Sequence, residues 1–170
     1  KEFVNLMGGE IWVESAENKG SGFYFTIPFR LGQPEHTMRK NHNSEGAPDL
    51  KGLHILLAED NTINQELVIE MLKPKGISVT TARNGAEALK ALANNQFDLV
   101  LMDIQMPVIN GLEATKRIRD SQNPIPIIAL TGSVLPQEKE EYIQCGVNEV
   151  VEKPIFIERL MEKIRLALQH

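Results

Sequence analysis

The chain has 170 residues, of which 42% are hydrophobic, and a formal net charge of −5. That length can hold one ordinary domain and a smaller segment, and the acidic balance excludes a general nucleic-acid binder, which needs clustered Lys and Arg. No apolar run approaches the ~20 residues of a membrane-spanning helix, so we expect no membrane contact by this fragment. Lys1 in place of Met predicts a piece of a longer protein. The one cysteine, Cys145, cannot form an internal disulfide, which fits a reducing compartment.

The first 30 residues contain two segments in which polar and apolar residues alternate, Glu10–Ser15 and Gly22–Pro28, separated by a turn-rich stretch. Alternation with a period of two on both sides of a turn predicts a β-hairpin. Because a lone hairpin is marginally stable in water, we expect it to be the remnant of a larger sheet. Residues 31–51 are polar, contain Gly and Pro and show no apolar period, which predicts a flexible linker.

From residue 52 onward, short apolar segments alternate with helical patterns. The expected strands are Leu53–Ala58, Ile77–Thr80, Phe97–Met102, Ile125–Leu130 and Val147–Val151. Three of them are apolar on both faces, as central parallel strands are, whereas the second mixes in polar residues as an edge strand can. The pattern predicts the α/β class, with a (βα)5 doubly wound parallel sheet in the flavodoxin-like order 2-1-3-4-5.

The helical segments carry local signals of their own. Asn84 lies three residues before Glu87, which predicts a capping pair at the start of one helix. In the last helix, one apolar stripe is expected to pack on the sheet. Its members are Ile157, Leu160, Met161, Ile164 and Leu168.

Acidic side chains follow two of the expected strands: Glu59 and Asp60 follow the first, and Asp103 follows the third. In the predicted strand order these ends share one crevice beside the topological switch point. Carboxylates so close repel one another unless a cation neutralises them, and hard oxygen ligands suit Mg²⁺ or Mn²⁺. We therefore expect a divalent-cation site at this edge of the sheet.

A hydroxyl and an ammonium group are expected at the same edge, because Thr131 follows the fourth strand and Lys153 the fifth. Lysine can pair with phosphate oxygens, and a threonine hydroxyl can donate to another. Each of these residues also has a simpler interpretation when it is considered alone: Asp60 as a helix N-cap, Thr131 as a turn residue and Lys153 as a solvated charge. A carboxylate nucleophile, a metal and a lysine at neighbouring strand ends together favour phosphoryl transfer.

Five segments resemble the receiver domain of response regulators. They are Leu56–Asn61, Val100–Pro107, Gly111–Leu112, Ala129–Thr131 and Glu152–Ile155. The resemblance covers residues 52–170 and implies that Asp103 accepts a phosphoryl group from phosphohistidine. The implied metal ligands are Glu59, Asp60, Asp103 and the main-chain carbonyl of Gln105. The resemblance also implies that Lys153 pairs with the phosphoryl group while Thr131 shifts toward it.

One position departs from the family pattern. The family commonly has Tyr or Phe three residues before the lysine, a side chain that turns inward when the threonine moves, and this chain has Val150 there. We therefore expect no aromatic flip at that position. Phosphorylation is expected to be communicated mainly by the loop Gly132–Pro136 and the polar helix Gln137–Gln144.

The N-terminal segment has a resemblance of its own: Leu6–Ser15 and Gly20–Pro28 are similar to the last two strands of a histidine-kinase ATP-binding domain. The order is then a kinase fragment at 1–30, a linker at 31–51 and a receiver domain at 52–170, as in a hybrid sensor histidine kinase. That order implies the kinase core of the same protein and a histidine-phosphotransfer domain as partners. It also implies a cytoplasmic location, as the soluble part of a membrane-anchored sensor.

Such a phosphotransfer domain would dock around the phosphorylation site. Candidate docking residues are Asn61, Ile63, Asn64, Leu67, Ile155 and Phe156. For Ile63 and Leu67 the alternative that they are simply core residues stays open.

Two other classes of protein share parts of this pattern. Mg²⁺-dependent phosphatases of the haloacid-dehalogenase type also use an Asp nucleophile at a strand end, but a second Asp follows two residues later, where this chain has Gln105. A receiver-like module that never carries phosphate has no physical need for crowded carboxylates. The fragment lacks the kinase machinery, so we expect of it only its own phosphorylation and slow dephosphorylation.

Overall fold

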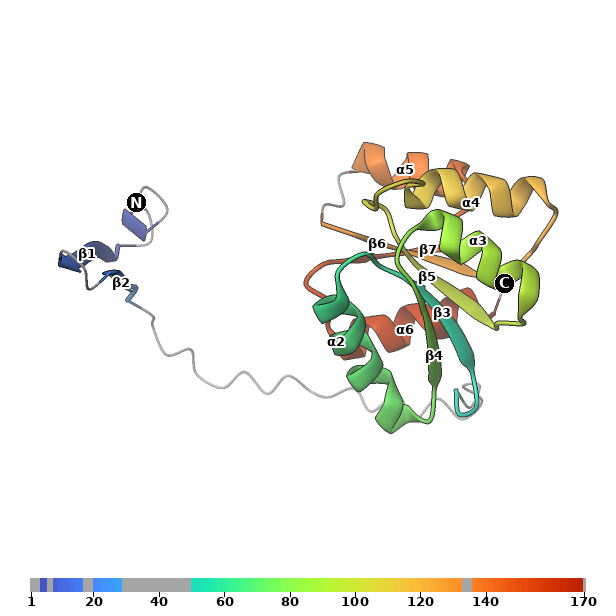
Figure 1. The fold of residues 1–170 in the computed structure, drawn as a ribbon, viewed down its shortest axis with the longest axis horizontal. Helices are drawn as coiled ribbons and strands as arrows, with labels where there is room; N and C mark the ends of the chain where they lie inside the picture. The colour runs from blue at the N-terminus through green and yellow to red at the C-terminus, as the bar shows by residue number, and fades with distance from the viewer. Residues whose placement is uncertain (1–3, 6–7, 17–19, 29–49, 133–135, 170) are drawn as a thin grey trace. The chain divides into compact units, whose positions relative to one another are not determined.

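The computed structural model describes residues 4–5, 8–16, 20–28, 50–132 and 136–169. The chain divides into two compact units, Lys1–Ser44 and Glu45–His170 (Figure 1). The linker predicted at 31–51 lies outside the described residues except at its last two positions, so it stays a prediction. None of the helices in the described ranges is long and apolar enough to cross a membrane.

The first unit contains the predicted β-hairpin. Strand β1 (Glu10–Ala16) pairs antiparallel with β2 (Gly20–Thr26), and Trp12 lies opposite Tyr24. The two rings stack with their centroids 5.7 Å apart. The most exposed apolar side chains of the hairpin are Val13, Phe23 and Phe25. The prediction of a hairpin is confirmed, and its apolar side chains lack the cover that a larger sheet would provide.

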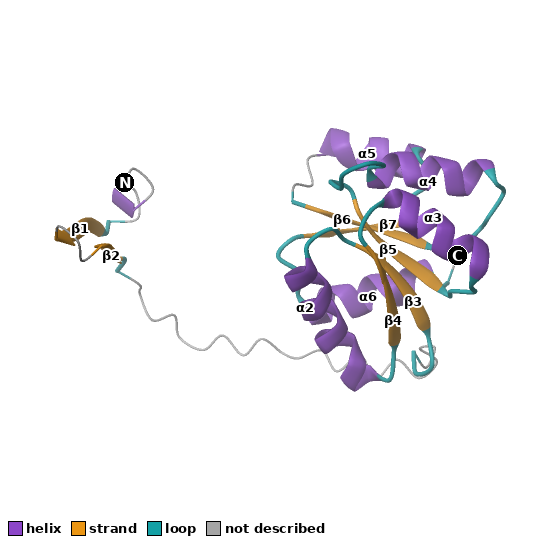
Figure 2. Ribbon diagram, viewed as in Figure 1, coloured by secondary structure: helices purple, strands orange, loops and turns teal. Residues whose placement is uncertain are grey.

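The second unit is built on a five-stranded parallel sheet, shown in orange in Figure 2. Its strands are β3 (His54–Ala58), β4 (Ser78–Ala82), β5 (Leu99–Asp103), β6 (Ile127–Thr131) and β7 (Glu149–Glu152). The spatial order β4-β3-β5-β6-β7 is the predicted order 2-1-3-4-5, and the strand predicted at an edge is the edge strand β4. The fold prediction is confirmed, with strand bounds shifted by one or two residues.

Helices cover both faces of this sheet. They are α2 (Thr62–Leu72), α3 (Gly85–Asn94), α4 (Gly111–Asp120), α5 (Pro136–Gln144) and α6 (Ile157–Ala167), with a short 3₁₀ turn η1 (Lys73–Lys75) after α2. Figure 1 shows α2 and α6 on one face and α3, α4 and α5 on the other. Right-handed crossovers between parallel strands produce this distribution.

Successive residues along each strand point into two separate cores, because side chains alternate between the faces of a sheet. One core contains Leu57, Leu101 and Leu130 together with residues of α2 and α6. The other contains Val100 and Ala129 together with residues of α3, α4 and α5. Burial on both faces explains why the central strands read as continuous apolar runs.

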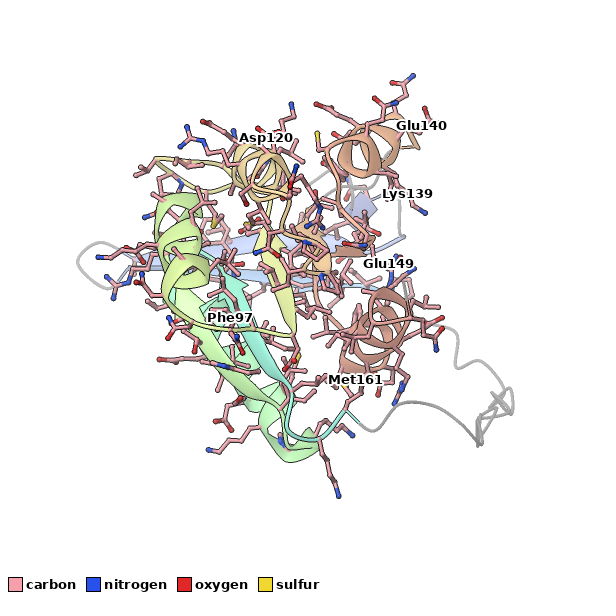
Figure 3. All side chains as sticks on the ribbon, turned by 90° about the vertical axis from the view of Figure 1, so that its right-hand side faces the viewer. Phe97, Asp120, Lys139, Glu140, Glu149 and Met161 are labelled. Carbon is pink, nitrogen blue, oxygen red and sulfur yellow. The ribbon has the colours of Figure 1, made fainter. Side chains whose placement is uncertain are left out.

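The apolar stripe predicted for the last helix packs on the sheet as expected. Leu160, Met161 and Ile164 are buried in the core beneath α6, and Met161 is labelled in Figure 3. Ile157 and Leu168 are partly buried against the same core.

Asparagine side chains cap three helices. Asn61, Asn84 and Asn110 each accept a hydrogen bond from the first turn of α2, α3 and α4, respectively. The predicted pair is confirmed, since the N–H of Glu87 donates to Asn84 at 2.9 Å. The simpler interpretation of Asp60 as an N-cap is wrong, because Asn61 fills that position.

Gly111 allows α4 to begin directly against the end of β5. Its N–H donates to the carbonyl of Ile104 at 3.1 Å, and a Cβ at this position would overlap the main-chain carbonyl of Asp103. Gly111→Ala is expected to lower the free energy of unfolding by ~1–3 kcal/mol because the helix must move away from the strand end. Urea denaturation measures the loss.

Gly132→Ala is the matched control for that variant. A Cβ on Gly132 would meet no atom of the described residues within 4 Å, so the stability of this variant should stay close to that of the wild type. Equal losses in the two variants would contradict a steric role for Gly111.

Candidate functional site

The carboxyl ends of β3, β5, β6 and β7 meet at one edge of the sheet, because these strands are parallel and in register. The predicted site residues at or just after these ends are Glu59, Asp60, Asp103, Thr131 and Lys153. Carboxylate oxygens of Glu59, Asp60 and Asp103 all lie within 4.8 Å of one another. The structure thus brings together three carboxylates from two strand ends.

Lys153 lies between two of these carboxylates. Its Nζ is 2.7 Å from Glu59 Oε2 and 2.7 Å from Asp103 Oδ2. Glu59 is only 1% exposed and Asp103 only 4%, so their charges would be costly without this partner. Asp60, in contrast, is exposed. The lysine expected to meet a phosphoryl group therefore also neutralises the carboxylates.

The first turn of α2 holds the buried Glu59 from the other side. Asn64 Nδ2 donates to Glu59 Oε1 at 2.9 Å, and the N–H of Asn61 donates to the same oxygen at 3.4 Å. Gln65 Nε2 donates to the Glu59 main-chain carbonyl at 2.6 Å. Sequence analysis missed the roles of Asn64 and Gln65 at Glu59. Two amide side chains in the helix that directly follows an acidic pair are the signal that could have found them.

Burial and Lys153 act in opposite directions on these groups. Burial raises the pKa of Glu59, but hydrogen bonds from Lys153 and Asn64 and the charge of Lys153 outweigh it, so that pKa lies below its ordinary value. For Asp103 burial prevails over the lowering by Lys153, and its pKa lies above the ordinary value. Burial lowers the pKa of Lys153, but its two carboxylate partners hold that pKa above the ordinary value. Negative charge is therefore held more firmly on Glu59 than on Asp103.

Thr131 and Gln105 each contact one member of this cluster through the main chain. Thr131 is buried at the end of β6, where its carbonyl accepts from the N–H of Lys153 at 2.7 Å. Its hydroxyl lies 3.5 Å from the hydroxyl of Tyr142 on α5, a neighbour that sequence analysis missed. The N–H of Gln105 donates to Asp103 Oδ1 at 3.1 Å. Metal ligation by the Gln105 carbonyl stays a prediction.

The helix expected to communicate phosphorylation is present as α5, and Val150 is buried on β7. In the loop predicted to act with that helix, residues 133–135 lie outside the described part of the chain.

The candidate docking residues divide into exposed and buried ones. Ile63 is 74% exposed, Leu67 49% and Phe156 61%, so the alternative that Ile63 and Leu67 are core residues is wrong. Ile155 is buried in the core beneath α6, so its candidacy as a docking residue is wrong as well. Its side chain packs on the sheet directly before α6 begins.

The pKa of Asp103 should respond in opposite directions to two substitutions in the metal-free protein. Lys153→Met removes a hydrogen bond and a positive charge, so the pKa should rise. Glu59→Gln removes a negative neighbour, so the pKa should fall. Carboxyl ¹³C NMR titration measures both. Lys163→Met, which breaks the separate 2.8 Å Lys163–Glu149 ion pair, should leave the midpoint unchanged. An unchanged midpoint in Lys153→Met would contradict the neutralising role of Lys153.

Comparison with known proteins points to the same part of the chain. Residues 55–165 match the family described as the response regulator receiver domain. The hybrid signal transduction histidine kinase K of Dictyostelium discoideum is 33% identical over 180 residues, covering 99% of this chain and 15% of that protein. The chain therefore spans a small part of the length of this curated relative.

Two solved structures share the fold of the second unit. The receiver domain of sensor histidine kinase PA1611 from Pseudomonas aeruginosa, with a magnesium ion in its active-site cleft, is 35% identical with a TM-score of 0.64, covering 70% of this chain and 99% of that one. The receiver domain of Saccharomyces cerevisiae Ssk1, crystallised with the histidine phosphotransfer protein Ypd1, is 35% identical with a TM-score of 0.64, covering 68% of this chain and 88% of that one. With the parallel sheet and the acidic cluster, these matches show that the chain belongs to the response regulator receiver domain family.

Proposed function

We propose that residues 52–170 act as the phosphoacceptor of a phosphorelay and that Asp103 receives the phosphoryl group. The observation that carries this proposal is the cluster in which Lys153 bridges Glu59 and Asp103 at 2.7 Å each, with the oxygens of Asp60 close by. Burying two carboxylates costs several kcal/mol per ion before their partner offsets it. A purely structural role for the domain gives no reason to accept that cost.

The proposed reaction is a transfer from phosphohistidine to a carboxylate. A carboxylate oxygen of Asp103 attacks the phosphorus atom, a P–O bond forms, the P–N bond breaks and its electron pair returns to the imidazole nitrogen. Lys153 lies close enough to Asp103 to exchange its contact with a carboxylate oxygen for a contact with a phosphoryl oxygen. The Thr131 hydroxyl can donate to another of these oxygens. The product is an acyl phosphate on Asp103.

The carboxylate cluster suits a divalent cation. Three hard oxygen donors that converge within 4.8 Å fit Mg²⁺ or Mn²⁺. Glu59, Asp60 and Asp103 would hold the ion, with the main-chain carbonyl of Gln105 as a further ligand. When bound, the cation neutralises the carboxylates and withdraws charge from the phosphoryl oxygens. The magnesium ion in the similar PA1611 receiver domain supports this assignment.

We infer that the parent protein is a hybrid sensor histidine kinase with its receiver near the cytoplasmic kinase core. Residues 1–30 would then be the end of the ATP-binding domain, 31–51 the linker and 52–170 the receiver. The alignment with hybrid kinase K over 99% of the chain supports this order. The exposed Phe23 and Phe25 of the hairpin support a larger sheet around it. The kinase core of the same protein is the proposed phosphoryl donor.

A histidine-phosphotransfer domain is the proposed acceptor, and an apolar surface beside the site supports it. Ile63, Leu67 and Phe156 are exposed, and we call them the docking surface. Asn64 on the same helix contacts Glu59, and Phe156 follows Lys153 by three residues, so the docking surface borders the carboxylate cluster. The complex of the similar Ssk1 receiver with Ypd1 supports a partner of this kind.

Phosphorylation by a small donor tests the acceptor. Incubation with acetyl phosphate and Mg²⁺ should add the mass of one phosphoryl group to the wild type and none to Asp103→Asn, as read by intact mass spectrometry. Asp120→Asn, at the exposed end of α4, is the control and should label like the wild type. Equal labelling of wild type and Asp103→Asn would exclude Asp103. Sustained turnover of a small phosphoester would instead indicate a hydrolase.

Phosphotransfer tests the docking surface. With the chain first phosphorylated by acetyl phosphate and Ypd1 added as the acceptor, Ile63→Ser and Leu67→Ser should each slow transfer about tenfold, because each removes a side chain worth ~1.5–3 kcal/mol on burial. Labelling by acetyl phosphate should be unaffected. Ile143→Ser removes a side chain that is 46% exposed on α5, on the opposite face of the sheet, and is the control. Wild-type transfer rates in the Ile63 and Leu67 variants would show that the partner does not bind to the docking surface.

A further inference from the structure

Tyr142 is the described side chain through which α5 is anchored in the core. It is 6% exposed, whereas its neighbours on the helix, Lys139, Glu140, Glu141 and Ile143, are all exposed. Figure 3 labels Lys139 and Glu140 on the outer side of α5. Among the described side chains of this helix, Tyr142 alone is buried. The contact of α5 with the sheet therefore depends mainly on one aromatic ring.

The hydroxyl of this ring reaches the candidate site. Tyr142 Oη lies 3.5 Å from Thr131 Oγ1, and both residues are buried. Thr131 directly follows Leu130, the register partner of Asp103, and its carbonyl accepts from the N–H of Lys153. A tyrosine hydroxyl buried among apolar side chains needs a hydrogen-bond partner. The Thr131 hydroxyl thus lies between the acidic cluster and the anchor of α5.

The geometry points to Tyr142 as the residue that transmits the phosphorylation state of Asp103 to α5, and as a positioning residue for the Thr131 hydroxyl. This inference rests on the proposed function and specifies its regulation. A phosphoryl group on Asp103 brings charged acceptor oxygens, and a hydrogen bond from Thr131 to one of them is stronger than one between two neutral hydroxyls. Thr131 then turns away from Tyr142.

The loss of that contact makes the buried position of Tyr142 less favourable. A buried hydroxyl without a partner costs ~1–3 kcal/mol, and α5 has no second buried side chain among its described residues to hold it in place. A cavity of about 480 Å³ lies between α4 and α5, lined by residues that include Leu112, Lys116 and Glu141, and leaves room for the helix to move. Phosphorylation should therefore displace Tyr142 and shift α5.

Val150 cannot perform this function from its own strand. It is buried on β7 as the register partner of Ala129, in the same core as Tyr142, and it has neither a ring nor a polar atom. The aromatic group near Thr131 comes from a helix instead of a strand. The residue proposed to sense phosphorylation is thus part of α5, the same helix that is expected to move.

Fluorine NMR of protein labelled with 3-fluorotyrosine tests the inference, because the chain has only two tyrosines, Tyr24 and Tyr142. Beryllofluoride with Mg²⁺ serves as the phosphoryl mimic, and its bound fluorines report occupancy of the site in the same spectrum. On binding, the Tyr142 signal should shift while the Tyr24 signal in the hairpin stays in place. Asp103→Asn should abolish both the bound beryllofluoride signal and the shift.

Tyr142→Phe separates the hydroxyl from the ring, which stays in the core. In this variant the amide shifts that beryllofluoride induces along α5 should fall at least twofold, as measured by ¹⁵N–¹H spectra. A full α5 response in Tyr142→Phe would overturn the inference, as would bound beryllofluoride without a Tyr142 shift, and both would leave the phosphoacceptor function intact. Failure of the wild type to bind beryllofluoride would overturn the proposed function and this inference with it.

Discussion

Lys153 joins two carboxylates that the fold buries at the ends of separate strands, and the rest of the site is arranged around that ion cluster. An isolated carboxylate in such a position would protonate or would require a large compensating interaction. One ammonium group shared between Glu59 and Asp103 supplies that compensation without filling every acceptor position. The ammonium group of Lys153 offsets both buried charges, yet it can exchange one of its carboxylate contacts for a contact with another anion. A phosphoryl group needs that kind of counter-charge.

The remaining parts of the fold can be understood as the support for this cluster. Parallel strands place their carboxyl ends at one edge, Gly111 lets α4 start against the end of β5, and the first turn of α2 supplies the amide that holds Glu59. Each support comes from a different element. The cluster therefore forms only when the whole sheet is assembled, which ties the chemistry of the site to the stability of the domain.

The sequence carried enough information for the sheet and the acidic cluster because both depend on strong, simple patterns. Strands buried on both faces read as apolar runs, and the topology rule then places Glu59, Asp60 and Asp103 together. Side-chain exposure was harder to predict. Ile63 and Leu67 have helical spacing, but the same spacing fits an exposed ridge and a buried one, whereas Ile155 looked like a surface residue and is core. The contact of Tyr142 with Thr131 could not be predicted, because Tyr142 lies in a polar helix and Thr131 lies eleven residues earlier, at the end of β6.

The alternation of side chains along the strands has a further consequence at their ends. Asp103 continues the row of Leu101, which packs toward α2 and α6, whereas Thr131 continues the row of Ala129, which packs toward α3, α4 and α5. Phosphorylation at this edge of the sheet would therefore affect side chains in both helical layers of the domain. The docking surface proposed for the phosphotransfer domain lies in the layer of α2 and α6, and the response proposed for α5 lies in the opposite layer. If both proposals hold, substitutions in one layer should alter the choice of partner without altering the response, because the whole sheet separates the two layers.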